Sequence, residues 1–422
     1  MSLQFEKLGS QFADFVSDPT SEASLAWAEA NHLKVSHTPS IHGVNYHIVR
    51  YDRSKYGQGD GQIEMPESIR LLRSVIIANG RIVSVCLPKC IDSSVISEAD
   101  HKLLSSTVME EGPMVNVFYV PNDERIQDQD DKEQFGWQMA TRSVIGARNS
   151  YFDDEVGNKV TFREMFLECM PENLFDTLDR NLCYSFVVRH PKNRDVYHEK
   201  EPHLVLAASF RPSADHMRWD YLETPLNHCY NSQMLSLTEV GVNDYQESIR
   251  ALGTTRLYCD RNGDLVRTKS ISEDYPGLRK LRGTQPKLLF HYLTLRKQKG
   301  AVSQYLTFYP YHGVTFDAFR QQVHRFTNEL YNSYCNCYIR KAKPLSEYDG
   351  RYKQHMYNIH ENFKQLRQSR QSDPTIRTRM SDVIQYVNGL APAQLMYVLN
   401  WERHANRPRP QAQEPCENNM EE

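Results

Sequence analysis

The sequence predicts an α+β protein, in which an antiparallel-rich domain is followed by an α-helical C-terminal domain. Short β-rich runs separated by Asn-Gly turns recur between residues 70 and 270. From about residue 314 onward, apolar residues repeat instead at the spacing of long amphipathic helices. At 422 residues, with 40% hydrophobic and 24% charged residues, the chain is long enough for two or three domains.

The net charge, the lengths of the apolar runs and the cysteine pattern limit the classes of protein to which this chain could belong. The formal net charge of -3 gives no overall basic bias, so any nucleic-acid binding must come from a local patch. No apolar run approaches the roughly 18 residues of a membrane span, and the N-terminus lacks a signal-peptide pattern. The nine cysteines are scattered, and the close pair Cys335 and Cys337 lacks zinc-ligand spacing. We therefore expect packed thiols in a reducing, intracellular compartment and no membrane partner.

The domain plan follows from the order of the patterns. We expect an N-terminal helical extension over residues 1–64, the antiparallel-rich domain over 65–300, the helical domain over 301–402 and a disordered tail over 403–422. The glycines at 57, 59 and 61 do not predict a phosphate loop, because no Gly-Lys-Ser/Thr ending follows them. A turn is the better interpretation.

The first β elements form a hairpin. Two β-branched runs, 75–77 and 82–85, flank Asn79-Gly80, the strongest short-range hairpin signal in a sequence. An acidic-Gly turn at residues 109–112 then leads into a Val-, Phe- and Tyr-rich strand at 114–120, and another strand is predicted at 137–141.

The next elements repeat this alternation. Residues 161–180 have helical spacing, and 183–189 and 204–210 predict strands, the latter buried. A second Asn-Gly hairpin is centred on Asn262-Gly263. Residues 275–296 then form a basic amphipathic block, which predicts either a phosphate-binding patch or a solvated helix face. The basic residues of this block are Arg279, Lys280, Arg282, Lys287 and Arg296.

The C-terminal part carries three apolar stripes. They predict helices that run over about 316–334, 352–363 and 383–399, the last interrupted at Gly389 and Pro392. These C-terminal helices are the surface that we expect a protein partner to contact.

Taken together, these motifs resemble the nucleotide-binding core of the covalent nucleotidyltransferases, the superfamily of RNA ligases, DNA ligases and capping enzymes. The hairpin with Arg73-Ser74 and Leu87-Pro88-Lys89 is similar to the one that precedes the nucleophile turn of the family. Thr141-Arg142-Ser143, the strand 183–194 and the pair Arg267 and Lys269 are similar to later family motifs, in the same order. The resemblance covers roughly residues 65–300.

Three short motifs indicate a more specific group within this superfamily. They are Glu-Glu-Gly at 110–112, Phe-Val-x-x-His-Pro-x-Asn-Arg at 186–194 and Leu-Arg-Gly-x-Gln-Pro-Lys at 281–287. Together they resemble a degenerate ligase-like group of the large nucleocytoplasmic DNA viruses, which includes the iridovirus-type immediate-early proteins. The resemblance implies a viral protein that acts early in infection, in the cytoplasm or nucleus of the host cell.

The sequence differs from the family at the positions of the family's catalytic residues. The family's nucleophilic Lys is Met109, its ribose-binding Glu is Val187 and its metal-supporting Glu is Leu252. A thioether cannot attack phosphorus as an amine does, and apolar residues cannot support a metal ion. The resemblance therefore implies a pseudoenzyme with no catalytic residue, no metal and no cofactor. Its vestigial nucleotide pocket would contain Glu111, Gly112, Arg142, Phe186, Arg267 and Lys269.

Three hypotheses follow. The first is a non-catalytic early or regulatory protein that binds a nucleotide, RNA or DNA, or a protein partner. The second is an active ATP-dependent RNA ligase, with ATP and Mg²⁺ as cofactors, that uses another lysine such as Lys89 or Lys102. The third is a purely structural or interaction module.

Two other features have competing interpretations. The carboxylates of Glu110 and Glu111 are better explained as acceptors of backbone N–H groups at a turn than as a metal-binding pair. His190 and His198 are better explained as solvent-facing loop residues than as catalytic groups.

Overall fold

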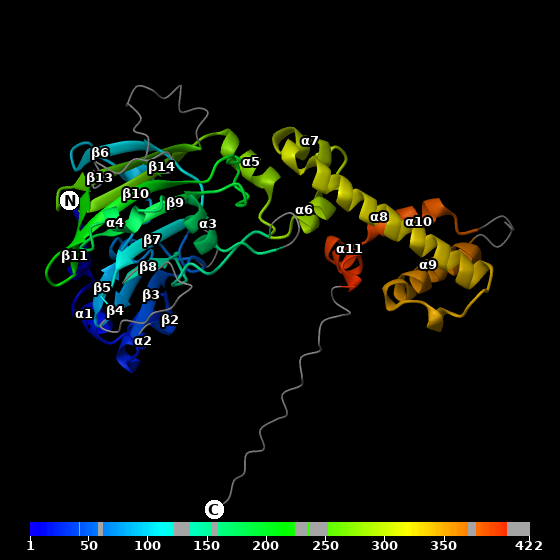
Figure 1. Cartoon of the computed structure of the whole chain (residues 1–422), viewed down its shortest axis with the longest axis horizontal. Helices are drawn as coiled ribbons and strands as arrows, with labels where there is room; N and C mark the ends of the chain where they lie inside the picture. The colour runs from blue at the N-terminus through cyan, green and yellow to red at the C-terminus, as the bar shows by residue number, and fades with distance from the viewer. Residues whose placement is uncertain are drawn as a thin grey trace, which may run out of the picture. The chain divides into compact units, whose positions relative to one another are not determined.

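The computed structural model describes residues 1–41, 43–57, 62–121, 136–153, 158–223, 234–236, 252–369 and 377–402, and divides the chain into two compact units (Figure 1). The first unit is Met1–Pro286 and contains the sheets, and the second, Lys287–Glu422, is helical where it is described. This confirms the α+β class. The boundary falls after Pro286 rather than at residue 300, and the predicted tail at 403–422 lies outside the described residues.

The central sheet has seven strands in the order β1-β11-β10-β9-β7-β8, with the short β12 parallel to β10 and the other pairs antiparallel. The predicted strands at 114–120, 137–141, 183–189 and 204–210 are all in it. Its members are β1 (Ser2–Gln4), β7 (Met114–Tyr119), β8 (Trp137–Ala140), β9 (Cys183–Arg189), β10 (His203–Pro212), β11 (Arg218–Leu222) and β12 (Met234–Ser236).

A second sheet has four strands, β2 (Leu33–Ile41), β3 (Val44–Tyr51), β4 (Val75–Ala78) and β5 (Arg81–Ser84). The turn between β4 and β5 confirms the predicted hairpin, because Asn79 and Gly80 both have positive φ, 51° and 69°, as a type I′ turn requires. Residues 68–71, a 3-10 helix, precede β4.

The N-terminal segment differs from the prediction of a helical extension. Helices α1 (Ser10–Ser17) and α2 (Glu22–Ala30) are present, yet β2 and β3 complete the second sheet. Tyr46, Ile48 and Val49 of β3 are fully buried. β3 pairs with β2 on one side and with the distant hairpin strand β4 on the other, and the pairing with β4 supplies backbone hydrogen bonds that no local pattern reveals.

The third sheet has the order β14-β13-β6, from β6 (His101–Val108), β13 (Gly253–Asp260) and β14 (Leu265–Ile271). It confirms the second Asn-Gly hairpin. Helix α5 (Asp274–Arg282) follows it directly.

Both faces of the central sheet are buried. On β7, Phe118 belongs to the core shared with the second sheet and α1, whereas Val115 and Val117 belong to a core covered by α3 (Phe162–Cys169) and α4 (Leu174–Thr177). Successive residues of a strand point to opposite faces, which produces this division. Figure 1 shows α3 beside the central strands. The predicted helix over 161–180 is thus two short helices, separated around Pro171.

The second unit contains α6 (Leu288–Leu295), α7 (Ala301–Phe308), α8 (Gly313–Tyr334), α9 (Gly350–Ser369), α10 (Met380–Gly389) and α11 (Pro392–Leu399). The predicted stripe on α8 is confirmed, since all six of its apolar residues from Phe316 to Tyr334 are buried. The interruption before Pro392 is also confirmed. None of the helices in the described ranges is both long enough and apolar enough to cross a membrane.

Candidate functional site

The acidic-Gly turn at 109–112 connects two sheets. β6, which precedes it, belongs to the third sheet, and β7, which follows it, belongs to the central sheet. The Met109 N–H donates to the Gly253 carbonyl oxygen (2.9 Å) and so holds the turn to β13. Gly112 has φ +141°, and a Cβ at this position would clash with the Val188 carbonyl oxygen. The turn therefore requires glycine there.

The residues at the positions where the resemblance would place catalytic groups lie close to this turn. Met109 packs against an apolar cluster of Leu252, Val196 and Tyr275. Val187 lies beside Gly112, with its Cγ1 3.0 Å from where a Cβ would be. The fold thus brings together the positions at which the resemblance expects a nucleophile, a metal ligand and a ribose ligand. All three side chains are apolar, so they provide neither the amine nor the oxygen ligands of nucleotidyl transfer.

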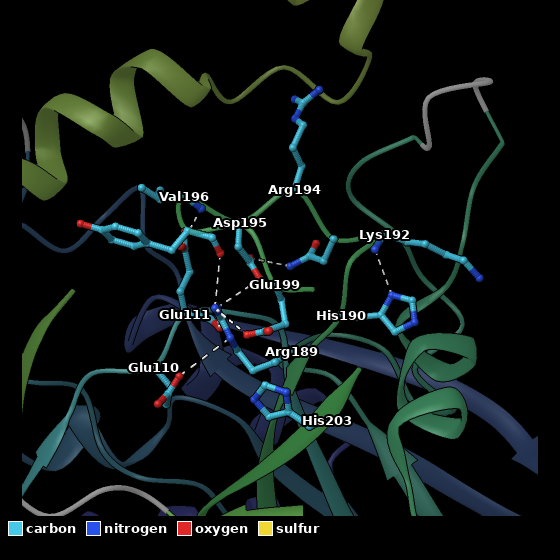
Figure 2. A network of polar contacts seen from close by, with 12 residues as sticks. Glu110, Glu111, Arg189, His190, Lys192, Arg194, Asp195, Val196, Glu199 and His203 are labelled. Atoms are coloured by element: carbon cyan, nitrogen blue, oxygen red, sulfur yellow. Dashed lines mark hydrogen bonds and ion pairs between the residues drawn. The ribbon is translucent and has the colours of Figure 1, made fainter. Parts of the chain in front are cut away.

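Glu111 is an internal hydrogen-bond acceptor (Figure 2). Its Oε2 accepts from the Val196 N–H (2.7 Å), and its Oε1 lies 3.3 Å from both Arg282 Nη1 and the Tyr275 hydroxyl. The expectation that this carboxylate accepts a backbone N–H is therefore confirmed. Arg282 is buried by the same contacts, so it is not part of an exposed basic patch.

Arg189, at the end of β9, is the centre of the surrounding network (Figure 2). Its Nη1 donates to the Glu111 carbonyl oxygen (2.6 Å) and to Asp195 Oδ2 (3.3 Å), and its Nη2 lies 3.4 Å from Glu199 Oε2. Burial raises the pKa of Asp195 to about 8, with the Glu111 charge acting in the same direction and Arg189 opposing both. Burial likewise raises the pKa of Glu110, again opposed by Arg189. The network ties the turn to the segment after β9.

His190 was predicted to face solvent, and this is wrong. The ring is buried, with Nε2 2.8 Å from Glu168 Oε2 on α3, while Nδ1 accepts the Lys192 N–H (3.1 Å). Burial lowers the pKa of His190, against the opposing effect of Glu168. The contact fixes α3 to the end of β9. Sequence gave no sign of it, because Glu168 and His190 belong to separate elements. His198 is exposed, as expected.

Arg142 lies in a separate, strongly cationic region. Its Nε donates to the Arg73 carbonyl oxygen (3.0 Å) and its Nη2 to the Tyr51 carbonyl oxygen (3.3 Å). The guanidinium lies 4.8 Å from the Tyr51 ring centroid, and Lys89 Nζ lies 5.8 Å from the same ring. Burial lowers the pKa of Arg142 to about 10, with nearby Arg53 the next cause.

A cleft of about 310 Å³ adjoins this region. Arg70, Lys89 and Arg267 contribute cations to it, from the 3-10 helix at 68–71, the segment after β5 and strand β14. Arg267 Nε is buried without a hydrogen-bond partner among the described residues. The lining consists of Lys7, Glu67, Ser68, Arg70, Leu71, Pro88, Lys89, Ile91, Asn262, Asp264, Leu265, Val266 and Arg267.

The charges of the cleft do not balance. Its lining has four cations and two carboxylates, and one of these, Asp264, is paired with Lys7. Burial lowers the pKa of Lys89, and the nearby charges of Arg70 and Arg53 add to this effect. Burial also lowers the pKa of Arg267, which Cys90 opposes and Arg73 reinforces. Crowded, partly desolvated cations of this kind attract an anion.

The structure separates the predicted pocket into parts. Arg142, Arg267 and Lys269 share the cationic region, as their mutual electrostatic neighbours Arg73 and Lys89 indicate. Glu111 and Gly112 lie in the turn network instead. Phe186 is fully buried against Phe166 and Tyr184, so it is not available to a ligand.

From the sequence we named Arg73 only as a hairpin residue and Lys89 as a hairpin residue and alternative nucleophile, and we did not predict that Arg70 and Arg73 belong to this region. Cations at both ends of that hairpin, Arg70 and Arg73 before it and Lys89 after it, were the available signal.

The five residues of the predicted basic patch differ in burial and belong to two units. Arg279 and Lys280 are exposed on α5 in the first unit, whereas Lys287 and Arg296 belong to the second unit. Arg296 donates to Asn388 Oδ1 (2.6 Å), and Arg282 is buried with Glu111. Among the five residues, Arg279, Lys280 and Lys287 are the exposed ones.

No protein-family model and no curated protein matches this chain. Among the residues that the structure describes, no group of three or more His, Cys, Asp or Glu side chains could hold a metal ion.

Proposed function

We propose that this chain is a catalytically degenerate protein on a ligase-like scaffold that binds a nucleoside polyphosphate in the cleft of Arg70, Lys89 and Arg267. One observation carries the proposal: the buried Arg267 Nε has no acceptor among the described residues, and the Arg267 side chain lines a cleft with three more cations. A buried donor without a partner costs about 1–3 kcal/mol, and a phosphate oxygen supplies the missing acceptor.

The size of the cleft agrees with this ligand class. Its volume of about 310 Å³ is at the lower end of the roughly 300–1,000 Å³ range of small-molecule sites. Arg267 is a planar fork that can bind phosphate oxygens in pairs, and Arg70 adds a second guanidinium. The expected role, an early or regulatory protein of a large DNA virus, rests on the sequence resemblance.

The turn at 109–112 has apolar side chains at the positions where a nucleophile and a metal-supporting residue would be expected, which favours nucleotide binding without covalent nucleotide transfer. Met109 packs against the apolar cluster that contains Leu252, and Val187 lies beside Gly112 of the turn. A nucleotide bound in the cleft would thus lack the family's nucleophile and metal support. The protein would act through occupancy of the site.

The test is ligand binding by the whole chain. ATP, GTP and inorganic triphosphate are titrated by calorimetry, and the melting temperature is measured in parallel. We expect stabilisation by at least one of them, by about 2.7 kcal/mol at a hundredfold excess over Kd. Arg70→Gln should weaken binding at least fivefold, and Arg218→Gln, at an exposed site on β11, should not. No binding, or equal binding by both variants, would contradict the proposal.

A second candidate function, covalent nucleotide transfer through Lys89, has one specific observation in its favour. The Lys89 amine lines the cleft, and burial together with Arg70 and Arg53 lowers its pKa, which increases the fraction of free amine. Lys102, the other lysine considered, is exposed on β6 and is not part of the lining.

Incubation with α-labelled ATP or GTP and Mg²⁺ or Mn²⁺, followed by denaturing electrophoresis, separates the two candidates. An acid-labile labelled band that is lost in Lys89→Arg and kept in Lys102→Arg would replace the non-catalytic proposal. Binding without a band supports it. Neither binding nor a band would leave the third hypothesis, a structural or interaction module.

A further inference from the structure

A groove in the second unit is not explained by the ligase-like scaffold. It consists of two adjoining cavities of about 920 and 560 Å³, which share Phe363, Arg377 and Thr378. The larger lies between the end of α8, α9 and the segment before α10. Its lining is Tyr331, Tyr334, Tyr338, Ile339, His360, Phe363, Arg367, Arg377, Thr378 and Arg379. The joined volume exceeds that of a single small-molecule site, so the groove suits an extended ligand.

Aromatic rings form one wall of the groove. Tyr338 and His360 are stacked, with centroids 3.9 Å apart and an interplanar angle of 11°, and Phe363 continues the series at 5.8 Å from His360. The buried Tyr334 hydroxyl lies 2.9 Å from Thr378 Oγ1 and 3.3 Å from His360 Nδ1. These contacts hold the rings in fixed positions. Burial lowers the pKa of His360, which keeps the imidazole neutral near pH 7.

Three arginines also line the larger cavity. Arg367, Arg377 and Arg379 are exposed, and none of them makes an ion pair with another described residue. The lining of the larger cavity contains no carboxylate, and the lining of the smaller one adds only Asp382. Three guanidinium groups beside stacked rings thus give the groove a positive charge that no ion pair among the described residues offsets.

The backbone at the groove is unusual as well. Helix α8 does not end in a regular cap but continues as a π-helical turn, Cys335–Ile339, which carries Tyr338 into the groove. Such turns are rare and are found frequently at functional sites. Ile339, the last residue of this turn, is exposed.

We propose that this groove binds single-stranded nucleic acid. The face of Phe363 and the Tyr338–His360 pair provide stacking positions for unpaired bases, and Arg367, Arg377 and Arg379 neutralise the phosphates that connect them. Aromatic platforms beside arginines are the combination by which proteins hold single strands without sequence preference. A duplex fits less well, because its bases are already stacked on one another. The site is independent of the cleft in the first unit.

The test is fluorescence anisotropy of the full chain with a fluorescein-labelled 15-nucleotide dT strand and the corresponding rU strand at several NaCl concentrations. We expect affinity to fall steeply with salt. Arg377→Gln should weaken binding at least threefold and reduce the slope of log affinity against log salt by about 0.7, the value for one lost phosphate contact. Phe363→Leu, which keeps apolar volume and removes the ring, should weaken binding about fivefold or more.

Two controls locate the site. Arg325→Gln removes an exposed charge from α8 that does not line the groove, and it should leave affinity unchanged. Arg70→Gln in the first-unit cleft should also leave it unchanged, so failure of the nucleotide proposal and of this one can be told apart.

Three outcomes would overturn the inference. One is equal affinity for a 15-base-pair duplex, and another is loss of strand binding in Arg70→Gln with none in Arg377→Gln. The third is displacement of the labelled strand by polyglutamate as effectively as by unlabelled dT strand at equal charge, which would assign the groove to an acidic protein segment.

Discussion

Replacement of Glu111 by alanine should destabilise the first unit severely. The carboxylate accepts the Val196 N–H (2.7 Å) and contacts Arg282 Nη1 and the Tyr275 hydroxyl, both at 3.3 Å. Its side chain and that of Arg282 are 12% and 9% exposed, so water does not replace the lost contacts. Arg282 would keep a buried charge that donates only to the backbone carbonyl oxygens of Arg194 (3.0 Å) and Gly283 (3.2 Å) among the hydrogen bonds of the described residues.

The magnitude follows from this burial. Removal of one partner from a buried ion pair costs about 3–5 kcal/mol, because the other charge stays desolvated. Loss of the hydrogen bond from the Val196 N–H contributes within that range, since an intramolecular hydrogen bond stabilises a protein by about 0.5–1.5 kcal/mol. We expect Glu111→Ala to lower the free energy of unfolding by about 3–5 kcal/mol.

Urea unfolding followed by tryptophan fluorescence measures this change. Three of the four tryptophans, Trp27, Trp137 and Trp219, belong to the first unit, so the signal reports mainly on it. The matched control is Glu98→Ala, which removes an exposed carboxylate and should change stability by less than about 0.5 kcal/mol.

A double-mutant cycle with Arg282→Ala isolates the pair. Because both single variants leave a partner unpaired, the double variant should recover part of the loss, with a coupling energy of about 1–3 kcal/mol. A cost below 1 kcal/mol for Glu111→Ala, or a coupling energy near zero, would refute the argument that this carboxylate holds the turn.

Three further predictions concern the same unit. Burial raises the pKa of Asp195 to about 8, so the folded chain holds a proton that the unfolded chain releases near pH 4. The free energy of unfolding should therefore fall as pH rises from about 4 to about 8, and Asp195→Asn should remove this contribution from urea curves measured across that range. Gly112→Ala should cost more than about 2 kcal/mol in the same assay, because its φ is +141° and a Cβ meets backbone, whereas Gly277→Ala in α5, which meets nothing, should stabilise by about 0.5–1 kcal/mol. Thr161→Ala removes the capping box of α3 and should lower the melting temperature, at a cost of about 1 kcal/mol; an unchanged value would show that packing alone holds this helix.

The sequence by itself determined the elements whose causes are local. Asn79-Gly80 specifies its turn through positive φ at two adjacent residues, and the α8 stripe specifies a helix through its spacing. The alternation of buried faces on β7 follows from the same kind of rule. These signals need no knowledge of any distant residue, which is why the α+β class could be predicted from them.

Only the tertiary structure determined the features that depend on contacts between residues distant in the sequence. β3 lies inside the second sheet because the distant strand β4 pairs with the edge that β2 does not occupy, and the His190 ring is buried where it contacts Glu168 of α3. Arg282 has the sequence context of an exposed cation and becomes half of a buried pair only when α5 packs on the turn.

The functional sites belong to the same category. Arg70, Lys89 and Arg267 come from three elements, and nearly two hundred positions separate the first from the last, so no sequence window contains their cleft. Tyr338 and Arg377 meet in one groove for the same reason. Burial and electrostatic crowding depend on distance in space, and sequence patterns report only spacing along the chain.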